Sequence, residues 1–173
     1  MHFESRARYE GTLDEVQRSL LDARYLDFVL AHHGVLLEAK LLETRAEPGR
    51  VWRRVRYRPR PVIARVGPEP VPAEWFAFVE ESTFDTARHQ LTFRNRPTTP
   101  SIADLLINTG TLTLREVAGR CERLMEGEIT VKLPFLLKPL ALIAEQLIHR
   151  EGLEILDGEV PVTNRFLVEV LRK

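Results

Sequence analysis

GEITVKLPFLLKPLALIAEQLI, residues 127–148, changes its hydrophobic period halfway along. Up to Leu133 apolar and polar residues alternate as in a strand, whereas from Pro134 onward the apolar residues recur at helical spacing. Proline is tolerated in the first turn of a helix because that turn needs no amide donor. The pattern therefore predicts a strand that leads directly into a long helix. The apolar face of this helix comprises Leu136, Leu140, Ile143, Ala144 and Leu147.

Gly158 and Pro161 each weaken a helix interior, so this predicted helix is a candidate for a bend or break near residues 158–161. Whether it is continuous past residues 158–161 is left open. The apolar stretch at 133–148 falls short of the roughly 20 residues of a membrane span, so we expect a buried helix and no stable membrane insertion. The side chains predicted on its exposed face are Glu145, Gln146, His149 and Arg150.

The beginning of the chain predicts one strand followed by two short helices. Residues 2–10 alternate as in a half-buried strand. Thr12 followed by Glu15 forms a capping-box pattern that starts a helix. A second helical pattern begins near Asp22 and ends before Gly34, where glycine commonly terminates a helix.

Between these two regions the period is twofold and turn signals recur about every dozen residues, which predicts an antiparallel meander. The segment 59–72 holds five prolines, so it is neither a central strand nor a helix. RPTTPS at 96–101 predicts a connector. The predicted strands are residues 36–45, 51–58, 75–84, 89–95, 106–115 and 121–133.

The composition excludes several classes of protein. The 173 residues carry 25 Lys plus Arg and 25 Asp plus Glu, so no global field attracts polyanions or an anionic membrane. Cys121 is the only cysteine, which excludes an intrachain disulfide. The charged N-terminus lacks the apolar run of a signal peptide. We expect one domain, residues 1–173, in the cytoplasm, and the sequence predicts no oligomeric state.

Three blocks carry a resemblance to a known superfamily: FESRARYEGTLDEV at 3–16, ARYLDFVLAHHG at 23–34, and the stretch at 127–148 quoted above. Together they resemble the START-related superfamily, which includes Bet v 1-like proteins and polyketide cyclases, and in particular a bacterial branch of unknown function. The chain departs from the common pattern at residues 136–139, where relatives often carry two glycines.

The resemblance implies an α+β helix-grip fold, in which a curved antiparallel sheet wraps around the long C-terminal helix. It also implies a cavity between sheet and helix. Members of the superfamily bind lipids, sterols or polyketides there, and some catalyse cyclisation or dehydration.

No motif for catalysis, a metal or a cofactor stands out. None of the five histidines lies four residues from another, and the sequence has no HExxH, Cys-x-x-Cys, GxSxG or P-loop pattern. Glu145 and His149 are four apart, and the pattern favours an exposed ion pair over a metal site. His32 and His33 follow a helix, where capping is the favoured role. We therefore predict no catalytic residue, no metal and no cofactor.

Residues on the inward face of the predicted strands and helix supply candidates for a ligand site. Buried aromatics at period two are also what any sheet core needs, so both interpretations stay open. Tyr9 and Tyr57 add hydroxyls to a mostly apolar wall, and Gly127 leaves room for a close approach. The candidate ligand-binding residues are Tyr9, Arg53, Val55, Tyr57, Phe78, Phe93, Met125, Ile129, Leu140, Ile143, Ala144 and Leu147.

The arginine-rich segment RVWRRVRYRPRP, residues 50–61, separates into two faces when it is placed on a strand. Arg54, Arg56 and Arg58 share the face predicted to be exposed, where glutamates such as Glu38 and Glu43 are candidate partners. Arg53 shares the inward face with Val51, Val55 and Tyr57. We hypothesise that Arg53 anchors a carboxylate or acidic headgroup at the cavity entrance.

Three functions are compatible with these features. The first is binding, with transport or sequestration, of a hydrophobic small molecule or lipid. The second is a cyclase or aromatase-like enzyme in which Tyr57, Arg53 or His89 handles protons. The third, a nucleic-acid or partner-binding module using the arginine strand, is disfavoured by zero net charge and alternating faces.

Overall fold

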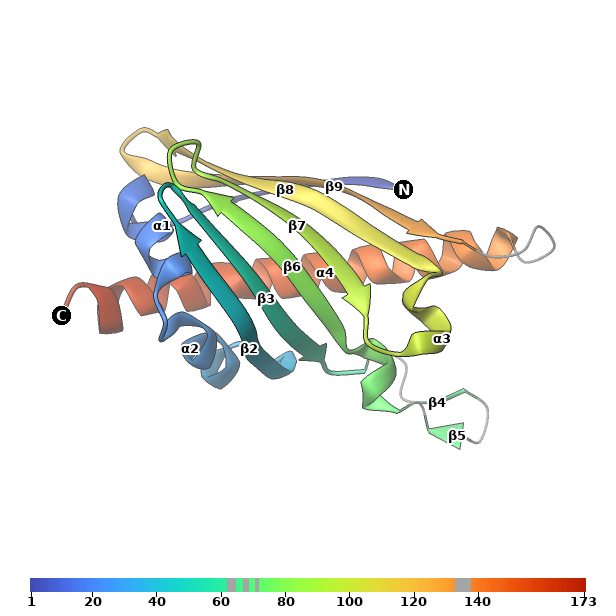
Figure 1. Cartoon of the computed structure of the whole chain (residues 1–173). Coiled ribbons are helices and arrows are strands. Elements are labelled where there is room, and N and C mark those ends of the chain that lie inside the picture. The colour runs from blue at the N-terminus through green and yellow to red at the C-terminus, as the bar shows by residue number, and fades with distance from the viewer. Residues whose placement is uncertain (62–64, 67–68, 71, 133–137) are drawn as a thin grey trace.

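A computed structural model describes residues 1–61, 65–66, 69–70, 72–132 and 138–173. Side chains are described for all of these except 65–66, 69–70, 101–102, 138–141 and 143. Seven antiparallel strands form one sheet in the order β1-β9-β8-β7-β6-β3-β2. The sheet arches over the long helix α4, so its concave face is turned toward that helix (Figure 1). The strands are β1 (His2–Arg8), β2 (Leu36–Glu47), β3 (Arg50–Pro59), β6 (Phe78–Asp85), β7 (Gln90–Pro97), β8 (Leu106–Val117) and β9 (Arg120–Val131).

Helices cover both ends of the sheet. Near the C-terminal end of α4 lie the two short helices that follow β1, and α3 lies toward its other end (Figure 1). Two-residue strands β4 and β5 pair with each other within the proline-rich segment. The remaining elements are α1 (Leu13–Leu21), α2 (Tyr25–His32), β4 (Arg65–Val66), β5 (Glu69–Pro70), η1 (Ala73–Phe76), α3 (Pro100–Ala103), α4 (Lys138–Phe166) and η3 (Leu167–Leu171). This arrangement confirms the predicted helix-grip fold.

Two predicted boundaries are wrong for local reasons. The strand predicted at 75–84 begins only at Phe78, because Ala73–Phe76 forms a 3-10 helix after Pro72. The connector predicted at 96–101 is shorter, because β7 extends to Pro97 and Pro100–Ala103 forms a helical turn. The proline and aromatic residues of these segments are compatible with a strand, a turn or a short helix. Contacts outside the segment decide among these structures.

Helix α4 is continuous through both positions where a break was considered. At Gly158 the missing side chain makes room for the imidazole of His33, since a methyl group there would approach Cε1 of His33 to 2.8 Å. Nε2 of His33 lies 2.7 Å from the carbonyl oxygen of Ile155, one turn earlier. Pro161 lies inside the helix, which continues to Phe166. The glycine therefore serves helix packing.

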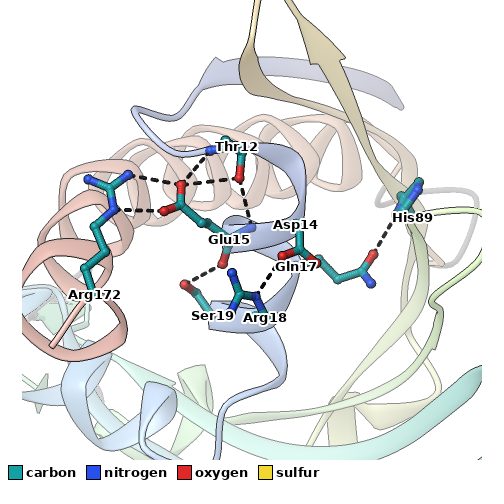
Figure 2. Close-up of polar contacts among 8 residues, drawn as sticks. All are labelled: Thr12, Asp14, Glu15, Gln17, Arg18, Ser19, His89 and Arg172. Atoms are coloured by element: carbon teal, nitrogen blue, oxygen red, sulfur yellow. Dashed lines mark hydrogen bonds and ion pairs between the residues drawn. The ribbon is translucent and has the colours of Figure 1, made fainter.

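The start of α1 is held by polar contacts to distant parts of the chain (Figure 2). Thr12 and Glu15 form the predicted capping box. Nε of Arg172 also lies 2.9 Å from Oε1 of Glu15, and this contact is the main reason that the pKa of Glu15 falls to about 2. On the same helix, Gln17 Oε1 lies 2.6 Å from Nδ1 of His89 in the β6–β7 turn. These contacts join α1 to the C-terminal residues and to the sheet.

None of the described helices is long and apolar enough to cross a membrane. The buried core contains side chains from both the sheet and the helices, including Phe84 of β6 and Phe166 of α4, both at most 1% exposed. The sheet and α4 therefore share one apolar interior.

Candidate functional site

A cavity of about 490 Å³ lies among the concave face of the sheet, α2 and α4. Most of its wall is apolar, with side chains from β6 to β9 on one side and from α4 on the other. Representative wall residues are Phe78, Leu91, Phe93, Leu106, Leu112, Ile129, Leu147 and Ile148. Small-molecule sites in proteins span about 300–1,000 Å³ and are mostly apolar, so this cavity has the size and character of one.

Two glycines shape the sheet side of this cavity. Gly110 of β8 and Gly127 of β9 are directly paired across the strands. A methyl group at position 110 would approach Cζ of Phe93 to 2.7 Å, and one at position 127 would approach Cζ of Phe3 to 2.6 Å. Both glycines therefore make room for an aromatic ring to lie against the sheet, and both rings line the cavity. The room predicted at Gly127 is occupied by Phe3.

The structure separates the twelve candidate ligand-binding residues into three groups. Tyr9 and Val55 are each 1% exposed and do not line the cavity. The side chains of Leu140 and Ile143 lie outside the described part of the chain. The other eight line the cavity, and their contact with a ligand stays a prediction: Arg53, Tyr57, Phe78, Phe93, Met125, Ile129, Ala144 and Leu147.

Arg53 faces the cavity, as its position among the inward residues of β3 predicted. Nη1 donates a hydrogen bond of 2.7 Å to the carbonyl oxygen of Leu20, at the end of α1. Trp75 of η1 also lines the cavity and is 56% exposed. Arg58, which pairs with Glu74 of η1, is five residues along β3, or about 17 Å at 3.3 Å per residue. Arg53 is itself partly exposed and lies away from η1, and its predicted place at the cavity entrance stays a prediction.

Glu80 is a cavity residue that the sequence analysis missed. Burial raises its pKa above the usual glutamate value, a shift opposed by the nearby Ser82 hydroxyl and Arg53 guanidinium and reinforced by Glu159. No cationic group among the described residues lies within ion-pair distance of Glu80. The sequence could have indicated this position, because Glu80 lies two residues after Phe78 on the same strand and therefore points to the same face.

Tyr57 lies beside this carboxyl group. Its ring centroid is 5.5 Å from that of Phe78. Burial raises the pKa of the Tyr57 hydroxyl well above its ordinary value, and the charge of Glu80 adds to the shift while Arg53 opposes it. Three titratable groups, Arg53, Tyr57 and Glu80, therefore face the same part of the cavity.

A second polar cluster is buried between β9 and α4. Arg123 is fully buried, and its Nη1 lies 3.1 Å from Oε2 of Glu159. The hydroxyl of Tyr25 donates to Oε1 of Glu159 at 3.0 Å and lies 2.6 Å from the hydroxyl oxygen of Thr163. Tyr9 packs beside this cluster, and its pKa is raised mainly by burial and also by Glu159. Its members bind one another, which identifies a structural network that joins sheet to helix.

Glu145, His149 and His89 do not form the sites considered from the sequence, whereas Nδ1 of His32 lies 2.8 Å from the carbonyl oxygen of Phe28 in the last turn of α2, as the predicted capping role requires. Glu145 is buried and accepts a hydrogen bond of 2.9 Å from the backbone amide of Val131, so its predicted exposed pairing with His149 is wrong. His149 lines the cavity, where its ring centroid lies 6.2 Å from that of Phe3. His89 bonds Gln17 and is not a cavity residue. The described residues contain no cluster of three or more potential metal ligands.

The opposite face of β3 carries the arginines that dominate the sequence. Arg56 pairs with Glu38 at 3.2 Å and with Glu74 at 2.5 Å, and Arg58 contacts the same two carboxylates. Arg54 lies 3.4 Å from Glu81 and 3.9 Å from Glu43. The predicted glutamate partners are therefore correct, and Glu74 and Glu81 add to them. These pairs explain the arginines as a solvated sheet face.

No protein-family model matches the chain, and no curated protein sequence matches it. Among solved structures it is similar to the Zhui aromatase/cyclase from Streptomyces sp. R1128, with a TM-score of 0.67, 14% identity, and coverage of 98% of this chain and 96% of that chain. It is also similar to norcoclaurine synthase of Thalictrum flavum, with a TM-score of 0.64, 12% identity, and coverage of 98% and 94%. For Ara h 8.0201 the TM-score is 0.58, with 11% identity and 97% coverage of both chains. At these identities the likeness establishes the fold.

Proposed function

We propose that this chain, which has the START-related, Bet v 1-like helix-grip fold, binds a hydrophobic small molecule or lipid between sheet and helix. The observation that carries the proposal is the cavity of about 490 Å³ with its mostly apolar wall. Binding there supports a role in transport or sequestration. We also propose a cytoplasmic location, which the single, free and buried Cys121 supports.

Gly152 offers a direct test because it lines the cavity from α4 and a methyl group there would meet no atom within 4 Å. Gly152→Trp should fill the cavity and lower the affinity for a neutral fluorescent probe, such as prodan, by about tenfold or more. Gly152→Ala is the matched control, because it adds a side chain too small to block the cavity. It should bind the probe like the natural protein and be slightly more stable, since alanine favours a helix interior over glycine.

Native mass spectrometry of gently purified protein provides the second readout. The proposal predicts an additional mass that is present in the natural protein and in Gly152→Ala but missing from Gly152→Trp. Failure of the natural protein to bind any apolar probe would refute the proposal. Equal probe binding by a folded Gly152→Trp variant would do so as well.

A second candidate function is catalysis of the aromatase/cyclase kind, for which the Zhui protein is the structural parallel. The convergence of Arg53, Tyr57 and Glu80 on one part of the cavity favours it, because burial raises the pKa of Glu80 and so favours the proton-bearing form that a proton donor needs. Incubation with a reactive poly-β-ketone should then give a cyclised product faster than buffer alone, and Glu80→Gln should abolish the difference. Equal rates with and without the natural protein would exclude this candidate.

A further inference from the structure

Three polar side chains line up across the concave face of the sheet. Glu80 of β6 is directly paired with Asn95 of β7, and Asn95 is directly paired with Asn108 of β8. Directly opposite residues on neighbouring antiparallel strands have Cβ atoms about 4.5–5.5 Å apart, so the three form a continuous row. All three line the cavity. We call Glu80, Asn95 and Asn108 the polar row.

On β7 and β8 the polar row has apolar or glycine positions on both sides. The paired positions on one side of it are Phe78 of β6 and Pro97 of β7. On the other side Phe93 of β7 faces Gly110 of β8. Ile129, which pairs with Asn108, ends the row on β9. A molecule in the cavity therefore meets hydrogen-bonding groups along this row and hydrocarbon on either side of it at β7 and β8. At the other end of the row, Ser82 of β6 and Arg53 of β3 are polar neighbours of Glu80.

The two asparagines of the polar row each have a side-chain oxygen without a partner in the described chain. Oδ1 of Asn95 and Oδ1 of Asn108 are buried, and neither has a hydrogen-bond partner among the described residues. Glu80 likewise has no ion pair with any of those residues. Buried polar atoms in folded proteins are nearly always hydrogen-bonded, so two adjacent exceptions mark unused hydrogen-bonding capacity beside the cavity. Both asparagine side chains are partly exposed, and both residues line the cavity. In the buried network around Arg123, Glu159 accepts from both Arg123 and Tyr25, although Nε of Arg123 and the hydroxyl of Tyr9 also lack a partner among the described residues.

We propose that the polar row is a recognition site that selects, among apolar molecules, neutral ligands carrying hydroxyl or carbonyl oxygens along one edge. An asparagine amide both donates and accepts hydrogen bonds, so it serves a hydroxyl and a carbonyl alike. The inference deepens the proposed function and rests on it, because it names the class of ligand that the same cavity takes.

A ligand carboxylate fits the polar row poorly. Glu80 lies within it, and a second carboxyl group would face the first in a site shielded from water. Arg53, which the sequence had suggested as a carboxylate anchor, already donates to the carbonyl oxygen of Leu20. It also lies beside Glu80, near enough to influence the ionisation of that carboxyl group. The surroundings therefore favour an uncharged polar edge.

Calorimetric titration with three matched probes tests this assignment. Naphthalene is apolar, naphthoresorcinol carries two hydroxyls meta to each other on the same skeleton, and 2-naphthoic acid carries a carboxylate. The natural protein should bind naphthoresorcinol about tenfold or more tightly than naphthalene, because a site built to hydrogen-bond a hydroxyl rejects the analogue that lacks it. It should bind the carboxylate most weakly.

The double variant Asn95→Leu/Asn108→Leu keeps the approximate side-chain volume and removes the amides. It should bind naphthalene at least as well as the natural protein does, and its preference for naphthoresorcinol should disappear. Thr109→Val is the matched control, since Thr109 follows Asn108 on the same strand, does not line the cavity, and the change likewise replaces a polar side chain by an apolar one of similar volume. This control should keep the preference.

Thermal unfolding separates recognition from a purely structural role. If the asparagines only stabilise the sheet, the double variant unfolds at a lower temperature, which would overturn the inference; the recognition site predicts an equal or higher unfolding temperature. A natural protein that binds naphthalene without preferring naphthoresorcinol would also overturn the inference and leave the proposed function intact. Tightest binding of 2-naphthoic acid, lost in Arg53→Met, would assign the site to carboxylates instead. Binding of none of the three probes would refute the proposed function itself.

Discussion

The two faces of the sheet treat their polar residues in opposite ways. On the convex face Arg54, Arg56 and Arg58 are each within 4 Å of at least one carboxylate and remain 28–40% exposed. On the concave face the polar row lies in the cavity wall, with two buried amide oxygens that have no partner in the described chain. Polar groups that already have partners serve solubility and structure. Nε of each of these three arginines also lacks a hydrogen bond, but it belongs to an ion-paired guanidinium group, whereas the unpartnered amides of the polar row belong to residues that line a cavity.

The Arg123 network sharpens this contrast because it is polar, buried and internally paired. Arg123→Met should lower the free energy of unfolding by about 3–5 kcal/mol, since it leaves the carboxylate of Glu159 without its cation. Urea denaturation measures the loss. The double variant Arg123→Met/Glu159→Gln should recover part of the stability, because it removes the unpaired charge. If Arg123→Met were as stable as the natural protein, the buried ion pair would not stabilise the fold. The contrast between paired and unpaired polar groups would then fail.

Glu80 and its neighbour Glu81 compare the two faces directly, because adjacent strand residues point to opposite sides. Burial favours the neutral form of Glu80, so the folded protein holds this proton more tightly than the unfolded chain does. Its stabilising contribution is complete below the ordinary glutamate pKa and is lost as the pH rises through the raised folded-state pKa. Glu80→Gln should remove this decline and increase the free energy of unfolding at neutral pH by about 1–3 kcal/mol.

Denaturant titrations of the natural protein, Glu80→Gln and Glu81→Gln across the pH range provide the measurement. Glu81 is the matched control, since its side chain is 43% exposed and lies 3.4 Å from Arg54 on the convex face. Glu81→Gln should leave the decline with pH in place. If the profiles of Glu80→Gln and the natural protein run parallel, Glu80 is not the buried acid that the contrast requires.

The convex ion pairs should give the smallest effect. Arg56→Ala removes contacts to Glu38 and Glu74, and exposed pairs of this kind contribute about 0.2–1 kcal/mol each. Unfolding measured at low and at high salt should show that the loss shrinks as salt screens the charges. A loss as large as that of Arg123→Met, or one independent of salt, would mean that the convex face also carries buried structural charges.

Features that depend on local order were predictable from the sequence. The twofold alternation of β3 separated Arg53 from Arg54, Arg56 and Arg58, because successive side chains of a strand point to opposite faces. The capping box of Thr12 and Glu15 spans three residues, so its geometry is also local. Pro72 and the two aromatic residues Trp75 and Phe76 misled the prediction, since a 3-10 turn and the start of a strand share those residue types.

Features that depend on pairing between distant segments were not predictable from alternation alone. Glu80 shares strand parity with Phe78, and Asn95 shares parity with Phe93, so each could have been assigned to the inward face. That they lie side by side depends on the register between β6, β7 and β8. A one-residue slip would have turned one of them to the other face, and the turns and core packing set that register. The same reasoning covers Gly158, whose partner His33 is far away in the chain.

The sequence alone was therefore sufficient to predict the order of the main strands and helices and the inward and outward faces of single strands. It also predicted a C-terminal helix long enough for a curved sheet to wrap around. These follow from periodicity and capping, which act over a few residues. The tertiary structure decided which inward polar groups found partners and which were left facing the cavity. Hydrogen-bond and ion-pair partners come from segments far apart in the chain, so only the folded arrangement identifies the paired Arg123 and the polar row of Glu80, Asn95 and Asn108.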